Sequence, residues 1–205
     1  MLQKLQYILV VKDIKQQLVI HKIMKDLVMF LQCLGAKKMN VDIRLAKKDE
    51  VLEIAKVKQK CWDSTYRGIY DDNIIDNFDY EKTANTFLSI IEDEDSDLYV
   101  VIVEDKIVGF MSCGKILHPY NDYEVELGML YILKEYQGEG IGTMCFMLAK
   151  DNMKRKGFKK FVVSANKYNN RAREFYKKMG GVEIHVDEDK DDRRSVQAKY
   201  DFSLE

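Results

Sequence analysis

The sequence contains little proline and histidine, and these shortages limit both its organisation and its chemistry. Pro119 is the single proline among 205 residues, and no stretch rich in proline, glycine and serine divides the chain. A chain of this length without such a linker fits one globular domain with a short appendage. The three histidines, His21, His118 and His185, are isolated, so no Ser/His/Asp triad or metal-site spacing includes them. We therefore expect no metal site.

Cysteine is also sparse and is not arranged in pairs. Cys33, Cys61, Cys113 and Cys145 are far apart in the sequence, with no C-x-x-C pair and no histidine at zinc-site spacing. Isolated cysteines are typical of reduced thiols in the cytosol. No hydrophobic run approaches the ~20 apolar residues that span a bilayer, and charges from Lys12 onward interrupt the first apolar stretch. The sequence thus predicts a cytoplasmic protein with no membrane span.

An excess of charge of either sign is absent. The chain has 33 Lys and Arg against 34 Asp and Glu, a formal net charge of −1. We therefore expect no nucleic-acid partner, because a global basic field is missing. Acidic residues do gather in two short runs, 92–97 and 187–192. Such runs are typical of solvated loops, and a sharper interpretation is a negative rim that attracts cationic amines such as polyamines.

The character of the sequence changes near residue 39. Residues 1–38 carry apolar side chains at mixed helical spacing, are mildly basic, and include Gly35, which suits a helix C-cap. We therefore divide the chain into an N-terminal helical extension, 1–38, and a domain, 39–205. The extension could contact a membrane surface, a partner protein or a second copy of the chain in a homodimer. Because Met39 directly precedes the domain, the extension could also lie outside the true start.

Residues 39–205 show the patterns of a compact α/β domain. The alternation from Val41 to Leu45 predicts a half-buried strand, and Asp49 can cap a helix that follows. Periodicity and turn residues predict further strands at 98–103, 106–112, 124–133, 158–165 and 195–202, and helices at 80–91, 140–155 and 169–179. The resulting order, β-α-α-β-β-β-α-β-α-β, predicts an α/β (α+β) domain with helices packed on a mixed sheet.

A glycine-rich loop, Gln137-Gly-Glu-Gly-Ile-Gly142, follows a predicted strand and opens a predicted helix. The first turn of a helix has unpaired N–H groups and the positive end of the helix dipole, so it can bind phosphate. Glycine lets the backbone approach the anion because it has no Cβ. The spacing is neither the G-x-G-x-x-G of a dinucleotide-binding fold nor a P-loop, which needs Gly-Lys-Ser/Thr. We expect this loop to hold a pyrophosphate, although in isolation the pattern also fits a flexible turn.

A second motif, Asn169-Asn-Arg-Ala-Arg-Glu-Phe-Tyr-Lys-Lys-Met-Gly180, combines a helix cap, a helix and a tyrosine. Ala172, Phe175 and Met179 have the spacing of an ordinary core-facing helix, and by that pattern alone Tyr176 would be a packing residue. The motif indicates a specific function only in combination with the glycine loop, which precedes it in the sequence at a suitable distance.

Together, the two motifs resemble those of the GNAT superfamily of acetyl-CoA-dependent N-acetyltransferases. The positions that match the family's Q/R-x-x-G-x-G/A loop and N-x-x-A-x-x-F-Y-x-x-x-G helix are Gln137, Gly140, Gly142, Asn169, Ala172, Phe175, Tyr176 and Gly180. The segments Trp62–Tyr70 and Asp122–Ile132 also resemble family members, so the resemblance covers about residues 41–203. Gly180-Gly181-Val182 departs from the Gly-Phe of many members. The resemblance implies a mixed, mostly antiparallel central sheet flanked by helices.

The resemblance also implies a site for acetyl-CoA as the co-substrate. The backbone of Leu130, Tyr131 and Ile132 would pair with the pantetheine arm at a splayed strand end, and the Ile132 N–H would polarise the thioester carbonyl. The residues that would cradle the pyrophosphate follow Gln137 and are Gly138, Glu139, Gly140, Ile141, Gly142 and Thr143. The Asn169 side chain would bind pantetheine.

A general acid and a base complete the implied mechanism. The Tyr176 hydroxyl would protonate the departing thiolate, since a thiol near pKa ~8.5 and a phenol near ~10 are close enough to share a proton. The acceptor, a small-molecule or peptide amine, must lose a proton before it attacks, because a primary amine is mostly charged at neutral pH. Glu126 is the candidate base: it precedes Ile132 by six residues, so strand alternation puts both side chains on one face. Glu126 could instead be a solvent-facing or salt-bridged carboxylate.

The acceptor side of the site is less well specified by the sequence. Trp62, Tyr66, Tyr123 and Glu124 are weaker candidates for its wall, and Trp62 is equally suited to anchor the core. Two other classes of function stay open: a non-catalytic acyl-CoA-binding sensor, and an interaction module in which the N-terminal extension dominates. The tyrosine and the carboxylate in the implied acid and base positions favour the enzyme. A fold shared across many substrates cannot identify the acceptor.

Overall fold

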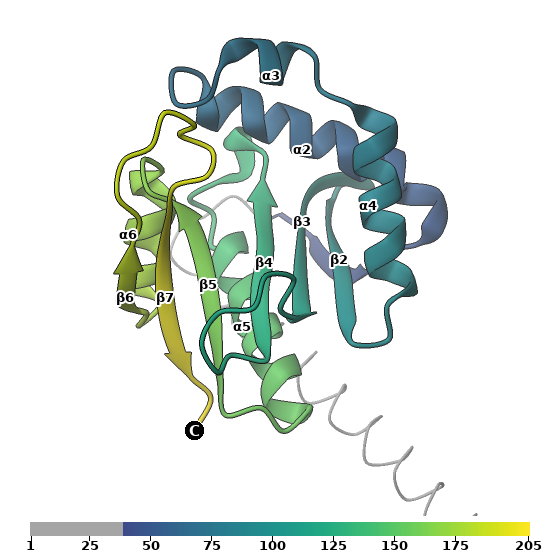
Figure 1. The fold of residues 1–205 in the computed structure, drawn as a ribbon. Coiled ribbons are helices and arrows are strands. Elements are labelled where there is room, and N and C mark those ends of the chain that lie inside the picture. The colour runs from purple at the N-terminus through teal and green to yellow at the C-terminus, as the bar shows by residue number, and fades with distance from the viewer. Residues whose placement is uncertain (1–38) are drawn as a thin grey trace, which may run out of the picture. The chain divides into compact units, whose positions relative to one another are not determined.

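A computed structural model describes the fold for residues 39–205 (Figure 1). The predicted helical extension, 1–38, lies outside the described residues. The elements in chain order are β1 (Val41–Leu45), the 3₁₀ turn η1 (Lys48–Glu50), α2 (Val51–Tyr66), α3 (Asp72–Asp76), α4 (Tyr80–Glu92), β2 (Ser96–Val103), β3 (Lys106–Lys115), β4 (Val125–Ile132), the 3₁₀ turn η2 (Lys134–Tyr136), α5 (Ile141–Arg155), β5 (Lys160–Asn166), α6 (Asn170–Lys178), β6 (Val182–Val186) and β7 (Gln197–Ser203).

These strands form a seven-stranded sheet with the order β1-β2-β3-β4-β5-β7-β6. Neighbouring strands are antiparallel except for β4 and β5, which are parallel. The hairpin between β2 and β3 turns at Glu104 and Asp105, whose φ angles of 49° and 61° suit a two-residue hairpin turn. The parallel pair needs a crossover connection, which α5 provides. The mixed, mostly antiparallel sheet predicted above is confirmed.

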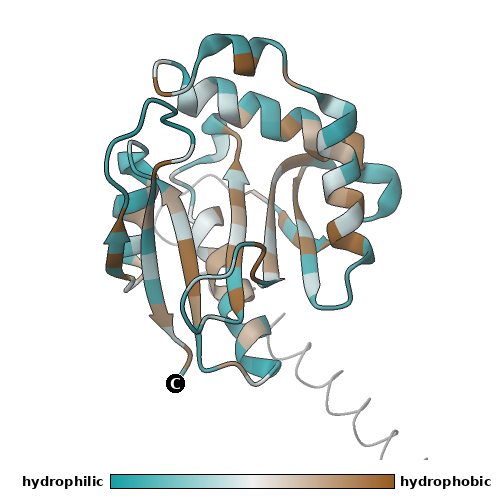
Figure 2. Ribbon diagram, viewed as in Figure 1, coloured by the Kyte–Doolittle hydropathy of each residue, from teal (hydrophilic) through white to brown (hydrophobic). Residues whose placement is uncertain are grey.

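Helices pack on both faces of this sheet. On one face α4 contributes Phe87, whose ring centroid lies 5.1 Å from that of Phe110 on β3. On the other face Phe146 of α5 packs against Phe202 of β7, with ring centroids 4.9 Å apart. Figure 1 shows α2 across the top of the view and α4 descending at its right, with α5 behind the sheet. In Figure 2 hydrophobic segments follow the central strands, whereas the loop before β7 is hydrophilic. The core therefore lies between the sheet and a helical layer on each side.

Two short elements are not predicted by the sequence patterns. The helix α3 spans five residues, too few for helical periodicity to register, and it begins where the Asp71 side chain accepts a hydrogen bond from the Asn73 N–H at 2.9 Å. The strand β6 is an edge strand that pairs with β7. Its residues from Val182 to His185 are all exposed, so it lacks the alternation of buried and exposed side chains by which a strand is recognised.

The pairing between β4 and β5 is short, and this shortness positions the site. Glu126 pairs with Val162 and Leu127 with Val163, and the register between the two strands extends no further. Beyond these pairs the two parallel strands diverge. The edge of β4 that faces β5 is therefore left without a strand partner up to Ile132.

A β-bulge follows immediately in β4. Cys113 of β3 pairs with Leu127, but the next residue, Ser112, pairs with Met129, so Gly128 is an extra residue without a partner of its own. A bulge of this kind bends the strand and shifts the alternation of its side chains. Even-numbered residues before Gly128 therefore point to one face of the sheet, and even-numbered residues after it point to the other.

Candidate active site

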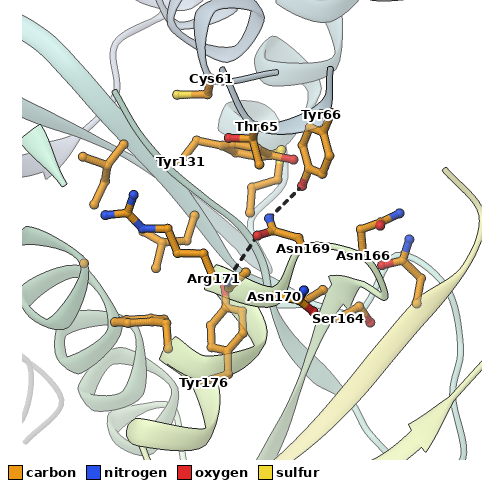
Figure 3. A pocket seen from close by; sticks show the side chains of 18 of the residues that line it. Cys61, Thr65, Tyr66, Tyr131, Ser164, Asn166, Asn169, Asn170, Arg171 and Tyr176 are labelled. Carbon is orange, nitrogen blue, oxygen red and sulfur yellow. Dashed lines mark hydrogen bonds between the residues drawn. The ribbon is translucent and has the colours of Figure 1, made fainter. Parts of the chain in front are cut away.

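A cavity of about 1060 Å³ opens where β4 and β5 diverge. Figure 3 shows how α2, β4, β5 and the start of α6 each contribute side chains to it. The predicted site residues that line the cavity are Glu126, Leu130, Tyr131, Ile132, Gln137, Gly138, Gly140, Gly142, Thr143, Asn169 and Tyr176. Two predicted residues are not in this lining: Glu139, whose side chain is exposed, and Ile141, which is buried in the core.

The open edge of β4 presents backbone groups to the cavity. The Leu133 N–H donates to the Val108 carbonyl of β3 at 2.9 Å. Because the N–H groups of a strand point alternately to its two sides, those of Leu130 and Ile132 point away from β3, toward the gap beside β5. The Tyr131 N–H points toward β3. Two of the three predicted strand residues thus have free donors at the open edge.

The glycine loop leaves a run of N–H groups without partners. The N–H groups of Tyr136 and Gln137 donate to Leu133 and Lys134, and the Met144 N–H donates to the Gly140 carbonyl at 3.1 Å. Between them, no hydrogen bond within the described part of the chain uses the N–H groups of residues 138–143. These donors lie at the start of α5, where the helix dipole is positive.

Glycine is required at two positions of this loop. Gly138 and Gly140 have φ angles of +91° and +82°, a region that residues with a Cβ rarely adopt.

The glycine loop is also attached to β4 by a side chain. Gln137 donates a hydrogen bond from its side-chain amide to the Ile132 carbonyl at 2.6 Å. This bond joins the loop to the end of β4, so the two sets of free donors lie next to each other.

Four cations that line the cavity were not identified from the sequence, and three of them lie by the glycine loop and α6. Lys134 lies in η2, and Arg171 and Lys178 lie on α6. Each is an ordinary surface residue by its local pattern, and only the fold brings them to the loop. Their positive charge adds to that of the α5 helix dipole and favours an anionic ligand.

Asn169 acts first as a helix cap. Its Oδ1 accepts a hydrogen bond from the Ala172 N–H at 3.1 Å, and its Nδ2 donates to the Tyr66 hydroxyl at 3.5 Å (Figure 3). The side chain lines the cavity. Its oxygen is committed to the cap of α6, so the long Nδ2 bond is the one that a ligand could replace.

Tyr176 is buried, with 6% of its surface exposed, and lines the cavity. Among residues 39–205 its hydroxyl has no hydrogen-bond partner. Burial raises the pKa of Tyr176, and the neighbouring Tyr66 raises it further. The phenol therefore stays protonated at neutral pH. The gap between the pKa of this phenol and that of a thiol is therefore wider than the ordinary values of the two groups suggest. Complete transfer of the proton from Tyr176 to a thiolate is correspondingly less favourable.

Glu126 lines the cavity but not on the face that was predicted. The bulge at Gly128 reverses the alternation, so Glu126 shares a face with Tyr131, whereas Ile132 points to the α5 side, where its Cδ1 lies 3.7 Å from the Cβ position of Gly142. The expectation that Glu126 and Ile132 share a face is therefore wrong.

The Glu126 carboxylate is half-buried and is held in place. Its Oε1 accepts a hydrogen bond from the Leu117 N–H at 3.2 Å. Burial raises the pKa of Glu126, while this hydrogen bond and the charges of Lys199 and His118 act in the opposite direction. No lysine or arginine of the described chain lies within ion-pair distance of it. The carboxylate is thus available to a ligand in the cavity.

Of the four residues predicted for the acceptor wall, only Tyr66 lines the cavity. The rings of Tyr66 and Tyr70 stack with centroids 4.2 Å apart, and both line the cavity. Trp62 is outside the lining; it packs edge-on against these tyrosines and donates to the Tyr131 hydroxyl at 3.4 Å. It is therefore a packing anchor.

Two of the weaker wall candidates, Tyr123 and Glu124, do not line the cavity. The Tyr123 hydroxyl donates to Asp201 at 2.7 Å, and Glu124 is exposed. Both lie in the segment before β4, beyond the paired end of β4 and β5. The prediction for these two residues is wrong, because the part of this segment that lines the cavity begins only at Glu126.

The acidic run before β7 is not an unpaired negative rim. Asp187 accepts from the Gln197 N–H, Asp189 pairs with Lys167 at 2.8 Å, and Asp192 pairs with Arg194 at 3.0 Å. Their charges are largely neutralised locally. In residues 39–205 there is also no group of three or more His, Cys, Asp or Glu side chains placed to hold a metal, and no helix long and apolar enough to cross a membrane.

The sequence of this chain is similar to those of known proteins. A family model described as the acetyltransferase (GNAT) family matches residues 58–181. A spermidine N(1)-acetyltransferase from Thermoplasma acidophilum is 26% identical over 147 residues, which cover 69% of this chain and 88% of that protein. An N-alpha-acetyltransferase 30 from Schizosaccharomyces pombe is 30% identical over 82 residues, which cover 40% of this chain and 55% of that protein.

Solved structures extend the likeness over most of the chain. The PaiA N-acetyltransferase from Thermoplasma acidophilum, in complex with coenzyme A, has a TM-score of 0.67 at 22% identity, covering 80% of this chain and 99% of that one. YncA from Salmonella typhimurium, with acetyl-CoA, has a TM-score of 0.63 at 18% identity, covering 80% and 94%. At these identities the likeness shows the shared fold.

Proposed function

Because this chain belongs to the GNAT family of acetyltransferases, we propose that it transfers the acetyl group of acetyl-CoA to a primary amine at the cavity between β4 and β5. The observation that carries the proposal is the combination of two sets of free backbone donors in one cavity. One set is the open edge of β4, and the other is the run of N–H groups at residues 138–143.

The residues present fit coenzyme A chemically. An extended pantetheine arm carries amide groups, which can pair with the open edge of β4 as an added strand would. A pyrophosphate suits the loop N–H groups and the positive end of α5. Lys134, Arg171 and Lys178 supply cations for the remaining phosphate charge. A neutral ligand would leave these cations and donors without a partner.

The open edge of β4 also supplies the polarising donor. Acetyl-CoA brings the thioester, and the N–H of Ile132 is the donor that we expect at its carbonyl. The N–H of Leu130 faces the same gap and lies two residues, roughly 7 Å, closer to Glu126 along the strand. A carbonyl at Leu130 would bring the attacked carbon nearer to the base. The N–H groups of Ile132 and Leu130 are therefore the two candidate donors to the oxyanion.

Tyr176 and Glu126 provide the acid and the base. The unpartnered hydroxyl of Tyr176 is a protonated donor in the cavity, so it can stabilise the sulfur as it leaves. Because burial raises its pKa, its main contribution is a hydrogen bond, and the proton follows as negative charge develops on the sulfur. Glu126 takes a proton from the acceptor amine, directly or through a water molecule.

One titration and one assay test the proposal. Calorimetry of the full chain should detect acetyl-CoA binding, and thiol release should depend on the presence of an amine from a panel of amino acids, polyamines and peptides with free N-termini. Failure to bind acetyl-CoA would overturn the proposal. Binding without amine-dependent thiol release would favour the alternative function, an acyl-CoA sensor on the same fold, over the enzyme.

A further inference from the structure

Lys199 lies at the end of the cavity where the amine acceptor would bind. In the register of the sheet, Lys199 on β7 lies opposite Ser164 on β5. Ser164 is two residues beyond Val162, which lies opposite Glu126 on β4. Residues two apart on a strand share a face. Glu126, Ser164 and Lys199 therefore point to the same side of the sheet, with β5 between the two charged residues, and all three line the cavity.

The Lys199 ammonium has no carboxylate partner. Its Nζ donates to the Ser164 Oγ at 3.0 Å and lies 4.6 Å from the centroid of the Tyr120 ring. Within residues 39–205, no Asp or Glu oxygen lies within 4.0 Å of it. The neighbouring Lys167 and Arg173, by contrast, are paired with carboxylates at 2.8 and 2.9 Å. A half-buried cation held in place by a hydroxyl and an aromatic ring is set up to bind an anion.

The charges lining the cavity can be divided between donor and acceptor. Lys134, Arg171 and Lys178 lie by the glycine loop and α6, where the phosphates of the donor would bind. The remaining charged residues of the lining lie at the acceptor end. They are one anion, Glu126, and one cation, Lys199, and the exposed His118 also belongs to this lining. The pair is complementary to a molecule that carries an amine and an anion together. A polyamine would bring a second ammonium toward Lys199 with no carboxylate to receive it.

We propose that the acceptor is a zwitterion, a primary amine that also carries a carboxylate, and that Lys199 binds this carboxylate while the amine faces Glu126. This inference rests on the proposed function. It identifies the substrate class as amino acids and molecules built like them, and it makes Lys199 a specificity-determining residue. The transfer itself is unchanged: the amine nitrogen gains the acetyl group and loses a proton, and the coenzyme leaves as a thiol.

Matched pairs of acceptors test the proposal. Thiol release from acetyl-CoA is followed with L-leucine and isopentylamine, L-tyrosine and tyramine, L-lysine and cadaverine, and spermidine. We expect the carboxylated member of the preferred pair to have a kcat/KM about 10- to 100-fold higher, the range of a hydrogen bond to a charged group. In Lys199→Met this ratio should fall toward one through a rise in the KM of the carboxylated member, and Lys199→Arg should restore it.

Lys160→Met is the control, because Lys160 also lies over a tyrosine ring, at 4.5 Å from Tyr123, but outside the cavity. It should leave the ratio unchanged. Equal losses for both members of a pair in Lys199→Met would indicate a structural role and overturn the inference. A preference for spermidine or for the decarboxylated amines would overturn it too, while leaving the acetyltransferase activity intact. Absence of any amine-dependent thiol release would remove the proposed function and this inference together.

Discussion

The Glu126 carboxyl is subject to opposing influences. Burial raises its pKa, and the Leu117 N–H and the Lys199 charge act against that rise without cancelling it. A base must be deprotonated to act, so the acid limb of the activity profile should lie above the ordinary range of a glutamate. The raised pKa also has a consequence for stability. The folded state favours the protonated carboxyl, so this contribution is present at low pH and is lost as pH rises through the pKa of the folded protein.

Glu126→Gln should therefore lower kcat/KM by about 10²-fold at pH values between the pKa of Glu126 and that of the amine. The deficit should shrink as pH approaches the pKa of the amine, near ~10, because the acceptor then loses its proton without help. Thermal unfolding of the variant should be shifted upward relative to the native chain at neutral pH, and less so in acid. Glu124→Gln, at an exposed residue outside the cavity, is the control. A deficit that is constant across pH would exclude a base role.

Tyr176→Phe isolates one hydroxyl in the cavity. Because the ring keeps its packing, acetyl-CoA affinity measured by calorimetry should be retained, while kcat should fall by about 10²-fold or more if the hydroxyl assists the departure of the thiol. Tyr99→Phe is the matched control: Tyr99 is equally buried, but its hydroxyl bonds Asn152 away from the cavity. That variant should lose some stability and keep its turnover. Unchanged kcat in Tyr176→Phe would remove this residue from the mechanism.

At the scale of elements, the sequence predicted the succession of the strand β4, the glycine loop and the helix α5. A strand, glycines and a helix in direct succession place free N–H groups at a helix start by local geometry alone. The bulge in β4 was harder to foresee. Glycine inside a strand pattern is a known signal for a bulge, and a strict alternation across Gly128 puts Glu126 on the wrong face. The bond from Gln137 to Ile132 depends on tertiary packing and has no local signal.

Gly140→Asp tests the loop as an anion-binding unit. Asp tolerates a positive φ better than most residues, so the fold should survive, whereas its charge would oppose a phosphate at the start of α5. We expect acetyl-CoA binding to become undetectable by calorimetry. Gly140→Ala carries the backbone strain without the charge and should bind more weakly than the native chain but more tightly than the Asp variant.

Gly157→Asp is the positional control for this loop. Gly157 has a φ of +91° at the other end of α5, with open space around its Cβ position. Its substitution should leave binding intact. Normal binding in Gly140→Asp would mean that the phosphates lie elsewhere.

At the scale of the whole molecule, the order of the long elements follows from the sequence, and the acceptor end of the site does not. Each long strand and helix has its own periodic pattern, so its type can be predicted without knowledge of its neighbours. Lys199, Ser164 and Glu126 come from three strands, and only the sheet order β4-β5-β7 brings them together. Such a cluster has no signal in any one segment. The missed edge strand β6 has the same cause, because it is defined by its pairing with β7 and not by its side chains.

The boundary near residue 39 separates the extension from a domain that should fold by itself. The buried core runs from Ile54 to Leu204, and residues 40–205 form one compact unit by their contacts. A chain of residues 39–205 should therefore unfold in one cooperative transition and bind acetyl-CoA as tightly as the full chain. A second truncation that starts at Ala46 removes β1, which pairs with β2 along its whole length and shields that strand's edge. It should unfold at a lower temperature and aggregate more readily. Loss of acetyl-CoA binding in the 39–205 chain, with the full chain binding normally, would place part of the site in residues 1–38.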